Sequence, residues 1–126
     1  MRLLRIALAQ VNTTVGDLDG NAALVLKGLD AARAAQADLV VFPELTITGY
    51  PPEDLLLRPQ FITDNLAVLH RIVRKVKGIA AVIGFVDRHE DIFNAAAFVA
   101  NGHHRLQHLR RHLVSRRPHA GTIARR

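Results

Sequence analysis

One carboxylate in this sequence is placed where it could handle protons. Glu44 follows the apolar run 38–42 and Pro43, and a loop rich in glycine and proline comes directly after it. A glutamate in such a place is either a surface or capping residue or a general base held in a partly dry pocket. The spacing of the residues does not by itself separate these two interpretations.

Histidines near the C-terminus raise the question of a metal site. His103, His104, His108 and His112 include pairs four residues apart, which lie on one side of a helix. No carboxylate is near them in the sequence. A tail without fixed structure, or a basic arm that binds nucleic acid, explains the same residues. We therefore expect no metal ligands in this chain.

The elements that must position Glu44 follow from the hydrophobic pattern. Residues 2–11 and 38–42 are short apolar runs typical of buried strands, and residues 19–36 predict a helix rich in Ala and Leu. Asp17 or Asp19 can cap the first turn of this helix. Strand, helix and strand in this order predict a βαβ unit with two parallel strands joined by a right-handed crossover.

Pro43 ends the second of these strands because it has no N–H to donate to the sheet. Glu44 is therefore expected at the carboxyl end of a parallel strand. Ligands bind at such ends in open α/β sheets. The predicted position and the chemistry of a general base agree.

The rest of the chain predicts one more helix and further strands. Residues 52–57 predict a helical turn, and residues 59–77 predict a helix whose apolar positions advance alternately by four and three. Residues 79–86 and 92–100 predict strands. The Asn-Gly pair at 101–102 is a strong hairpin signal that calls for a fifth strand. The residues after it are too polar to fill a core face, and we predict no strand there.

The charge divides the chain at the same place. Residues 1–100 hold ten Lys/Arg and eleven Asp/Glu, a net charge of −1, whereas residues 101–126 hold seven Arg and no acid, a net charge of +7. We predict one α/β domain over residues 1–102 and a basic, disordered tail over residues 103–126. An alternative is a small α/β module whose basic tail binds nucleic acid.

Composition excludes several classes of protein. The sequence has no Cys, which excludes disulfides, thiolate metal sites and a Cys nucleophile among these 126 residues. The longest apolar run, 79–86, is far shorter than the roughly 20 residues that cross a membrane. The N-terminus lacks the pattern of a secretory signal. We expect a cytoplasmic protein without membrane contact.

A family resemblance gives these residues a specific meaning. The segment Phe42-Pro43-Glu44-Leu45, followed by Thr48-Gly49-Tyr50-Pro51-Pro52-Glu53-Asp54-Leu55-Leu56, resembles the first catalytic segment of the carbon–nitrogen hydrolase (nitrilase) superfamily. The continuation GYPPEDLL is more specific and is similar to the glutaminase domain of glutamine-dependent NAD+ synthetases. Further similar segments lie at 9–12, 15–18, 83–85 and 94–96, and the resemblance covers residues 3–102.

The resemblance implies a fold and a reaction. The fold would be part of a nitrilase-type α-β-β-α sandwich. Glu44 would be the proton acceptor beside a Lys and a Cys nucleophile, and Tyr50 would line the pocket for the substrate glutamine. The released ammonia would pass to a separate synthetase domain that uses ATP and Mg²⁺, so we expect no cofactor in this chain. A homo-oligomer is expected for the full-length family, and nucleic acid is not an expected partner.

The tail departs from the family pattern. No Lys follows Lys77, no Cys is present, and Arg110 and Arg111 cannot take the role of the family Lys. We therefore expect an N-terminal fragment that is inactive alone, because a base without its thiol cannot start the reaction. A reading frame lost near residue 102 is our hypothesis for the acid-free tail.

Overall fold

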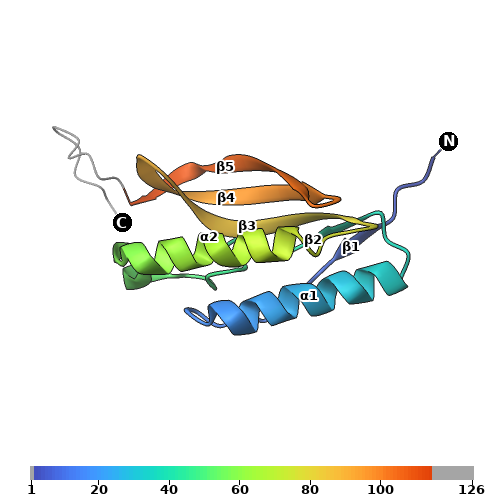
Figure 1. Cartoon of the computed structure of the whole chain (residues 1–126), viewed down its shortest axis with the longest axis horizontal. Coiled ribbons are helices and arrows are strands. Elements are labelled where there is room, and N and C mark those ends of the chain that lie inside the picture. Colours follow the sequence, from blue (N-terminus) through green and yellow to red (C-terminus); the bar gives the residue numbers. More distant parts are fainter. Residues whose placement is uncertain (1, 115–126) are drawn as a thin grey trace.

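Two helices cover one face of a five-stranded sheet in the computed structural model, which describes the backbone of residues 2–114 and the side chains of residues 2–105 (Figure 1). The strands are β1 (Ile6–Leu8), β2 (Leu39–Val41), β3 (Ala80–His89), β4 (Asp91–Ala100) and β5 (His103–Val114). The helices are α1 (Leu18–Ala34), the short 3-10 helix η1 (Glu53–Leu57) and α2 (Pro59–Val73). No helix within the described residues is long and apolar enough to span a membrane.

The predicted βαβ unit is confirmed. β1 pairs with β2 in parallel, β2 pairs with β3 in parallel, and the sheet order is β1-β2-β3-β4-β5. Asp17 is the N-cap of α1, and its carboxylate accepts a hydrogen bond of 3.0 Å from the N–H of Gly20. The core lies between the helices and the sheet, where Val25, Leu29 and Val40 are fully buried.

The second long helix ends earlier than predicted. α2 stops at Val73, whereas the sequence pattern extends to residue 77. The next residues form tighter turns, in which the N–H groups of Lys75 and Val76 each bond a carbonyl three residues back. The guanidinium of Arg33, on α1, donates to the carbonyls of Lys75 (2.8 Å) and Lys77 (2.8 Å). The carbonyls of Lys75 and Lys77 therefore have hydrogen-bond donors without a further helical turn.

The prediction of no strand after residue 102 is wrong for residues 103–114. They form β5, which pairs antiparallel with β4 from Ala100↔His103 to Ile92↔Val114. Asn101 and Gly102 both have positive φ angles, 49° and 78°, as a tight hairpin turn requires. An edge strand is held by backbone hydrogen bonds to a single neighbour, so polar side chains are compatible with it. The sheet is therefore not cut after four strands.

The remainder of the predicted tail, residues 115–126, lies outside the described residues. The division of the chain at residue 102 into a domain and a tail stays a prediction.

Candidate active site

Glu44 lies just beyond the carboxyl end of β2, where the sequence predicted it. The N–H of Phe42 still donates to the carbonyl of Val82 (2.9 Å), so the chain stays attached to β3 for one residue after β2. Pro43 then turns the chain away, and the Glu44 side chain is exposed. β2 has a parallel neighbour on each side, β1 and β3, and Glu44 follows its carboxyl end, where α/β proteins bind ligands.

One buried amide holds the carboxylate of Glu44. The side-chain Nδ2 of Asn94, on β4, donates to Glu44 Oε1. Asn94 is only 6% exposed, and its Oδ1 is buried without a hydrogen-bond donor among the described residues. A hydrogen bond to a carboxylate is stronger than one between neutral groups, so this contact fixes the direction of the carboxylate. No hydrogen bond joins the second oxygen of Glu44 to another side chain of residues 2–105.

A glycine on β3 makes this contact between β2 and β4 sterically possible. Gly84 lies between the two strands, and an added Cβ would come within 2.5 Å of the N–H nitrogen of Leu45 and of the carbonyl oxygen of Pro43. The segment 43–45 therefore lies directly on the sheet at Gly84. This close approach brings Glu44 within reach of Asn94.

The loop after Glu44 is buried and tied to two other segments. Residues 45–49 are all buried, and the N–H of Ile47 donates to the carbonyl of Gly84 (3.2 Å). The buried amide of Asn21, in the first turn of α1, donates to the carbonyls of Ile47 (2.9 Å) and Thr14 (2.8 Å) and accepts from the N–H of Thr14 (2.8 Å). The loop that follows the carboxylate is thereby anchored rather than free.

Tyr50, the second predicted site residue, follows this buried loop. Its side chain is 65% exposed, so it is not packed in the core. The role that the resemblance gives to Tyr50 is not tested by its position.

The sequence alone did not single out Asn94 as a site residue. The signal was present, because Asn94 is a lone amide inside the apolar strand segment 92–100. A buried polar group needs a hydrogen-bond partner, so an amide in such a run indicates a specific contact. The partner itself lies fifty residues away in the sequence, and no local pattern identifies it.

The histidines do not form a metal centre in the part of the chain with described side chains, where no group of three potential ligands is arranged to hold an ion. The ring of His104 lies against that of His70 on α2, with 5.6 Å between ring centroids. The side chains of His108 and His112 lie outside the described residues.

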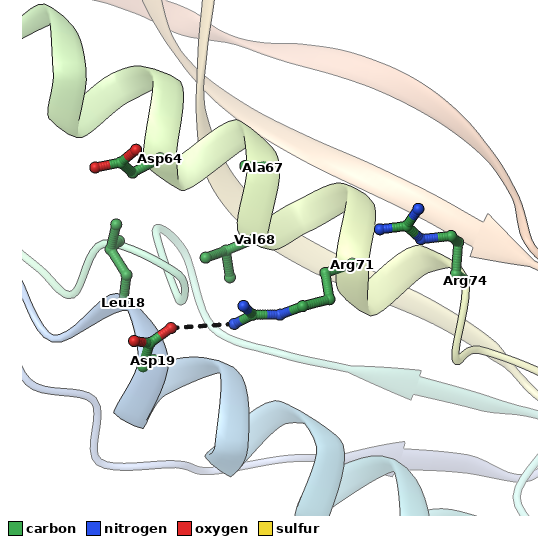
Figure 2. Close-up of a pocket in the computed structure, with 7 residues that line it drawn as sticks. All are labelled: Leu18, Asp19, Asp64, Ala67, Val68, Arg71 and Arg74. Atoms are coloured by element: carbon green, nitrogen blue, oxygen red, sulfur yellow. Dashed lines mark hydrogen bonds and ion pairs between the residues drawn. The ribbon is translucent and has the colours of Figure 1, made fainter.

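A separate cavity of about 460 Å³ lies on the helical side of the sheet (Figure 2). It is lined by Leu18, Asp19, Asp64, Ala67, Val68, Arg71 and Arg74. Arg71 Nη2 pairs with Asp19 Oδ1 at 3.1 Å, and both side chains are at least half exposed. Two acids balance two arginines here, and exposed pairs of this kind contribute little to stability. Glu44 does not line this cavity.

Comparison with known proteins places the chain in a family. The family model described as carbon-nitrogen hydrolase matches residues 5–125, which includes residues beyond the predicted boundary at 102. The glutamine-dependent NAD(+) synthetase of Thermotoga maritima is 43% identical over 104 residues, which is 81% of this chain and 18% of that protein. That of Xanthomonas campestris is 44% identical over 101 residues, 79% of this chain and 18% of that protein.

Solved structures of proteins with similar names also have a similar fold. A glutamine-dependent NAD+ synthetase from Acinetobacter baumannii, in complex with ADP, has a TM-score of 0.78 and 34% identity over 83% of this chain and 20% of that chain. An amidase from Nesterenkonia sp. has a TM-score of 0.70 and 25% identity over 81% of this chain and 40% of that chain. The chain spans about a fifth of the length of the synthetases that it matches.

Proposed function

The chain belongs to the carbon–nitrogen hydrolase family, and from this premise we propose that it forms the glutamate-bearing part of a glutaminase like that of glutamine-dependent NAD+ synthetases. The observation that carries the proposal is the pair Glu44 and Asn94, a strand-end carboxylate held by a buried amide. The identity to synthetases from several bacteria supports glutamine as the substrate.

In this proposal Glu44 carries the proton. A thiol supplied by a later segment of a longer chain gives its proton to Glu44, and its sulfur bonds to the carboxamide carbon of glutamine. Glu44 then returns the proton to the nitrogen, the C–N bond breaks, and ammonia leaves a thioester behind. A water molecule, whose proton passes through Glu44 to the sulfur, cleaves the thioester to glutamate and the free thiol. A positive group facing the carbonyl oxygen stabilises the charge that develops there. Of the groups in this scheme, the present chain would supply the proton acceptor, Glu44.

The remaining parts of the proposal concern the substrate and the use of ammonia. Tyr50 would form part of the wall of the glutamine pocket, because it follows the anchored loop 45–49. The ammonia would serve a synthetase domain of a longer protein, where ATP and Mg²⁺ would be used. No cofactor is proposed for the chain itself.

The 126 residues contain no Cys, so we expect the purified chain to release no ammonia from glutamine.

The alternative of a module that binds nucleic acid has no support. The relatives named above are synthetases and an amidase, and none of them is described as a nucleic-acid-binding protein.

A graft tests the proposal with a positive readout. Residues 3–102 replace the matching segment of the Thermotoga maritima synthetase, to which this chain is 43% identical. We expect the graft to form NAD+ with glutamine as the nitrogen source. Glu44→Gln in the graft should abolish this rate and leave the rate with added ammonium chloride intact, because free ammonia bypasses glutamine hydrolysis.

The control is Asp30→Asn, which removes the charge of an exposed carboxylate on α1, outside the segment that carries Glu44. It should leave both rates near those of the unmodified graft. A graft in which Glu44→Gln still uses glutamine would refute the role of Glu44.

A further inference from the structure

After β2 the chain leaves the sheet and then returns to β3. The N–H of Phe42 donates to the carbonyl of Val82 (2.9 Å), and the N–H of Ile47 donates to the carbonyl of Gly84 (3.2 Å). In a parallel pair, successive bonds of this kind come from residues two apart, so a continued strand would bond Gly84 through Glu44. Ile47 takes that place three residues later in the chain. The extra residues carry Glu44 off the sheet.

Leu45 lies in this excursion directly after Glu44, and its backbone is left-handed. Its φ angle is 49°, in a region that bulky side chains rarely adopt. Such a conformation is unfavourable for leucine by itself, so the surrounding structure must hold it. Residues held in this way are concentrated at functional sites. The position of Leu45 next to the candidate proton acceptor fits this tendency.

The side chain of Leu45 is buried, which can hold the turn. It is 1% exposed and belongs to a second hydrophobic cluster, whose other buried members are Leu56, Ile62, Val86 and Ile92. Burial of a leucine side chain is favourable by at least the order of the cost of a left-handed backbone. The hydroxyl of Thr46 also donates to the carbonyl of Pro43, which closes the turn on its inner side.

The second cluster lies beside the amide that binds Glu44. Val86 on β3 pairs in register with Asn94 on β4. Ile92 and Asn94 are two residues apart on β4, so they share one face of the sheet. The residues that hold Leu45 and the residue that binds the preceding carboxylate therefore come from the same part of two neighbouring strands.

We propose that Leu45 is a positioning residue for the proton acceptor. Its buried side chain holds the left-handed turn, and the turn directs the carboxylate of Glu44 to Asn94. Leu45 contacts no reacting atom in this proposal and acts only through Glu44. The catalytic consequence rests on the proposed function, whereas the structural part concerns this chain alone.

Nuclear magnetic resonance of the full 126-residue chain tests the structural part. The side-chain N–H signals of Asn94 report its bond to Glu44. Leu45→Ala should move these signals to the shifts of a solvent-exposed amide. Leu29→Ala removes a fully buried leucine from the main core and should leave them in place. Leu45→Met keeps the side-chain volume and should also leave them in place. Unchanged Asn94 signals in Leu45→Ala would overturn the proposal.

Two further variants of Leu45 test the left-handed turn itself. Glycine adopts positive φ angles readily, although elsewhere it is less favourable than alanine. Urea unfolding should therefore find Leu45→Gly at least as stable as Leu45→Ala, and a clearly less stable Leu45→Gly would overturn the role of the turn. If Leu45→Ala does not fold, Leu45→Val replaces it in the resonance experiment, because a β-branched residue is tolerated least at positive φ.

The grafted synthetase tests the catalytic consequence. Leu45→Ala should lower the glutamine-supported rate about tenfold or more and keep the ammonia-supported rate, because the base is misplaced. In an Asn94→Ala graft the same change should cost less than about twofold, since the contact that it directs is already lost. Losses that multiply would overturn the proposal. Normal glutamine use in Leu45→Ala would overturn only the role of Leu45, whereas normal use in Glu44→Gln would refute the proposed function.

Discussion

Asn94 and Glu44 form the smallest unit of the candidate site. The amide group of Asn94 is buried and can rotate little, so the oxygen that it binds is held in one place. Its Oδ1 has no donor within the described residues. A buried acceptor that lacks a donor costs free energy. We interpret this cost as a sign that the Asn94 amide serves the candidate site and does not stabilise the sheet.

Removing the amide should therefore impair the use of glutamine more than the fold. We expect Asn94→Ala in the grafted synthetase to lower the glutamine-supported rate by about 10- to 100-fold, because small misplacements of a catalytic group have effects of this size. The ammonia-supported rate should not change. Asn12→Ala, at an exposed asparagine before α1, is the control. Equal losses in both rates would show that Asn94 supports the fold only.

The close contact between the backbone of residues 43–45 and Gly84 on β3 determines where Glu44 lies. Gly84→Ala would place a methyl group 2.5 Å from backbone atoms of Pro43 and Leu45, which cannot move as a flexible side chain can. We expect the segment to be displaced, with the glutamine-supported rate of the graft lost and its melting temperature lowered.

Gly78→Ala is the comparison for that variant. Its added Cβ meets no atom within 4 Å, although its φ of 72° strains any other residue by about 1 kcal/mol. It should lower the melting temperature modestly and keep the use of glutamine. A Gly84→Ala graft with normal glutamine use would contradict the steric account.

Arg33 joins the ends of the two long helices. Its guanidinium donates to the carbonyls of Lys75 and Lys77 beyond α2, and it also pairs with Asp30 at 2.9 Å. We expect Arg33→Met to lower the free energy of unfolding by about 1–3 kcal/mol, because bonds from a charged group to the backbone are lost. Urea unfolding of the chain measures this.

Asp30→Ala separates the two contacts of Arg33. The Asp30 side chain is 79% exposed, so its ion pair should contribute less than about 1 kcal/mol. An unfolding free energy that falls as much for Asp30→Ala as for Arg33→Met would show that the ion pair, and not the backbone contacts, carries the stabilisation.

For the molecule as a whole, local patterns predicted most elements. The apolar spacing of α2, the cap at Asp17 and the turn at 101–102 are signals carried by neighbouring residues, and each appears in the structure. The strand after that turn was missed because an edge strand needs little apolar content. The contact of Asn94 with Glu44 and the approach at Gly84 join distant segments, which no local pattern specifies.

The whole sheet also separates two surfaces. Both helices lie on one face, whereas Asn94 lies on the other. The segment 43–45 lies against Gly84 on the same face as Asn94, so the candidate site is on the side of the sheet opposite the helices.

The central claim is that Glu44 is the proton acceptor of a glutaminase, and one ratio tests it most directly. This is the rate of NAD+ formation with glutamine divided by the rate with ammonium chloride, measured in the grafted synthetase with Glu44 and with Glu44→Gln. The account predicts a ratio near that of the unmodified synthetase for Glu44 and a fall of at least about 100-fold for Glu44→Gln. An unchanged ratio in Glu44→Gln would contradict it.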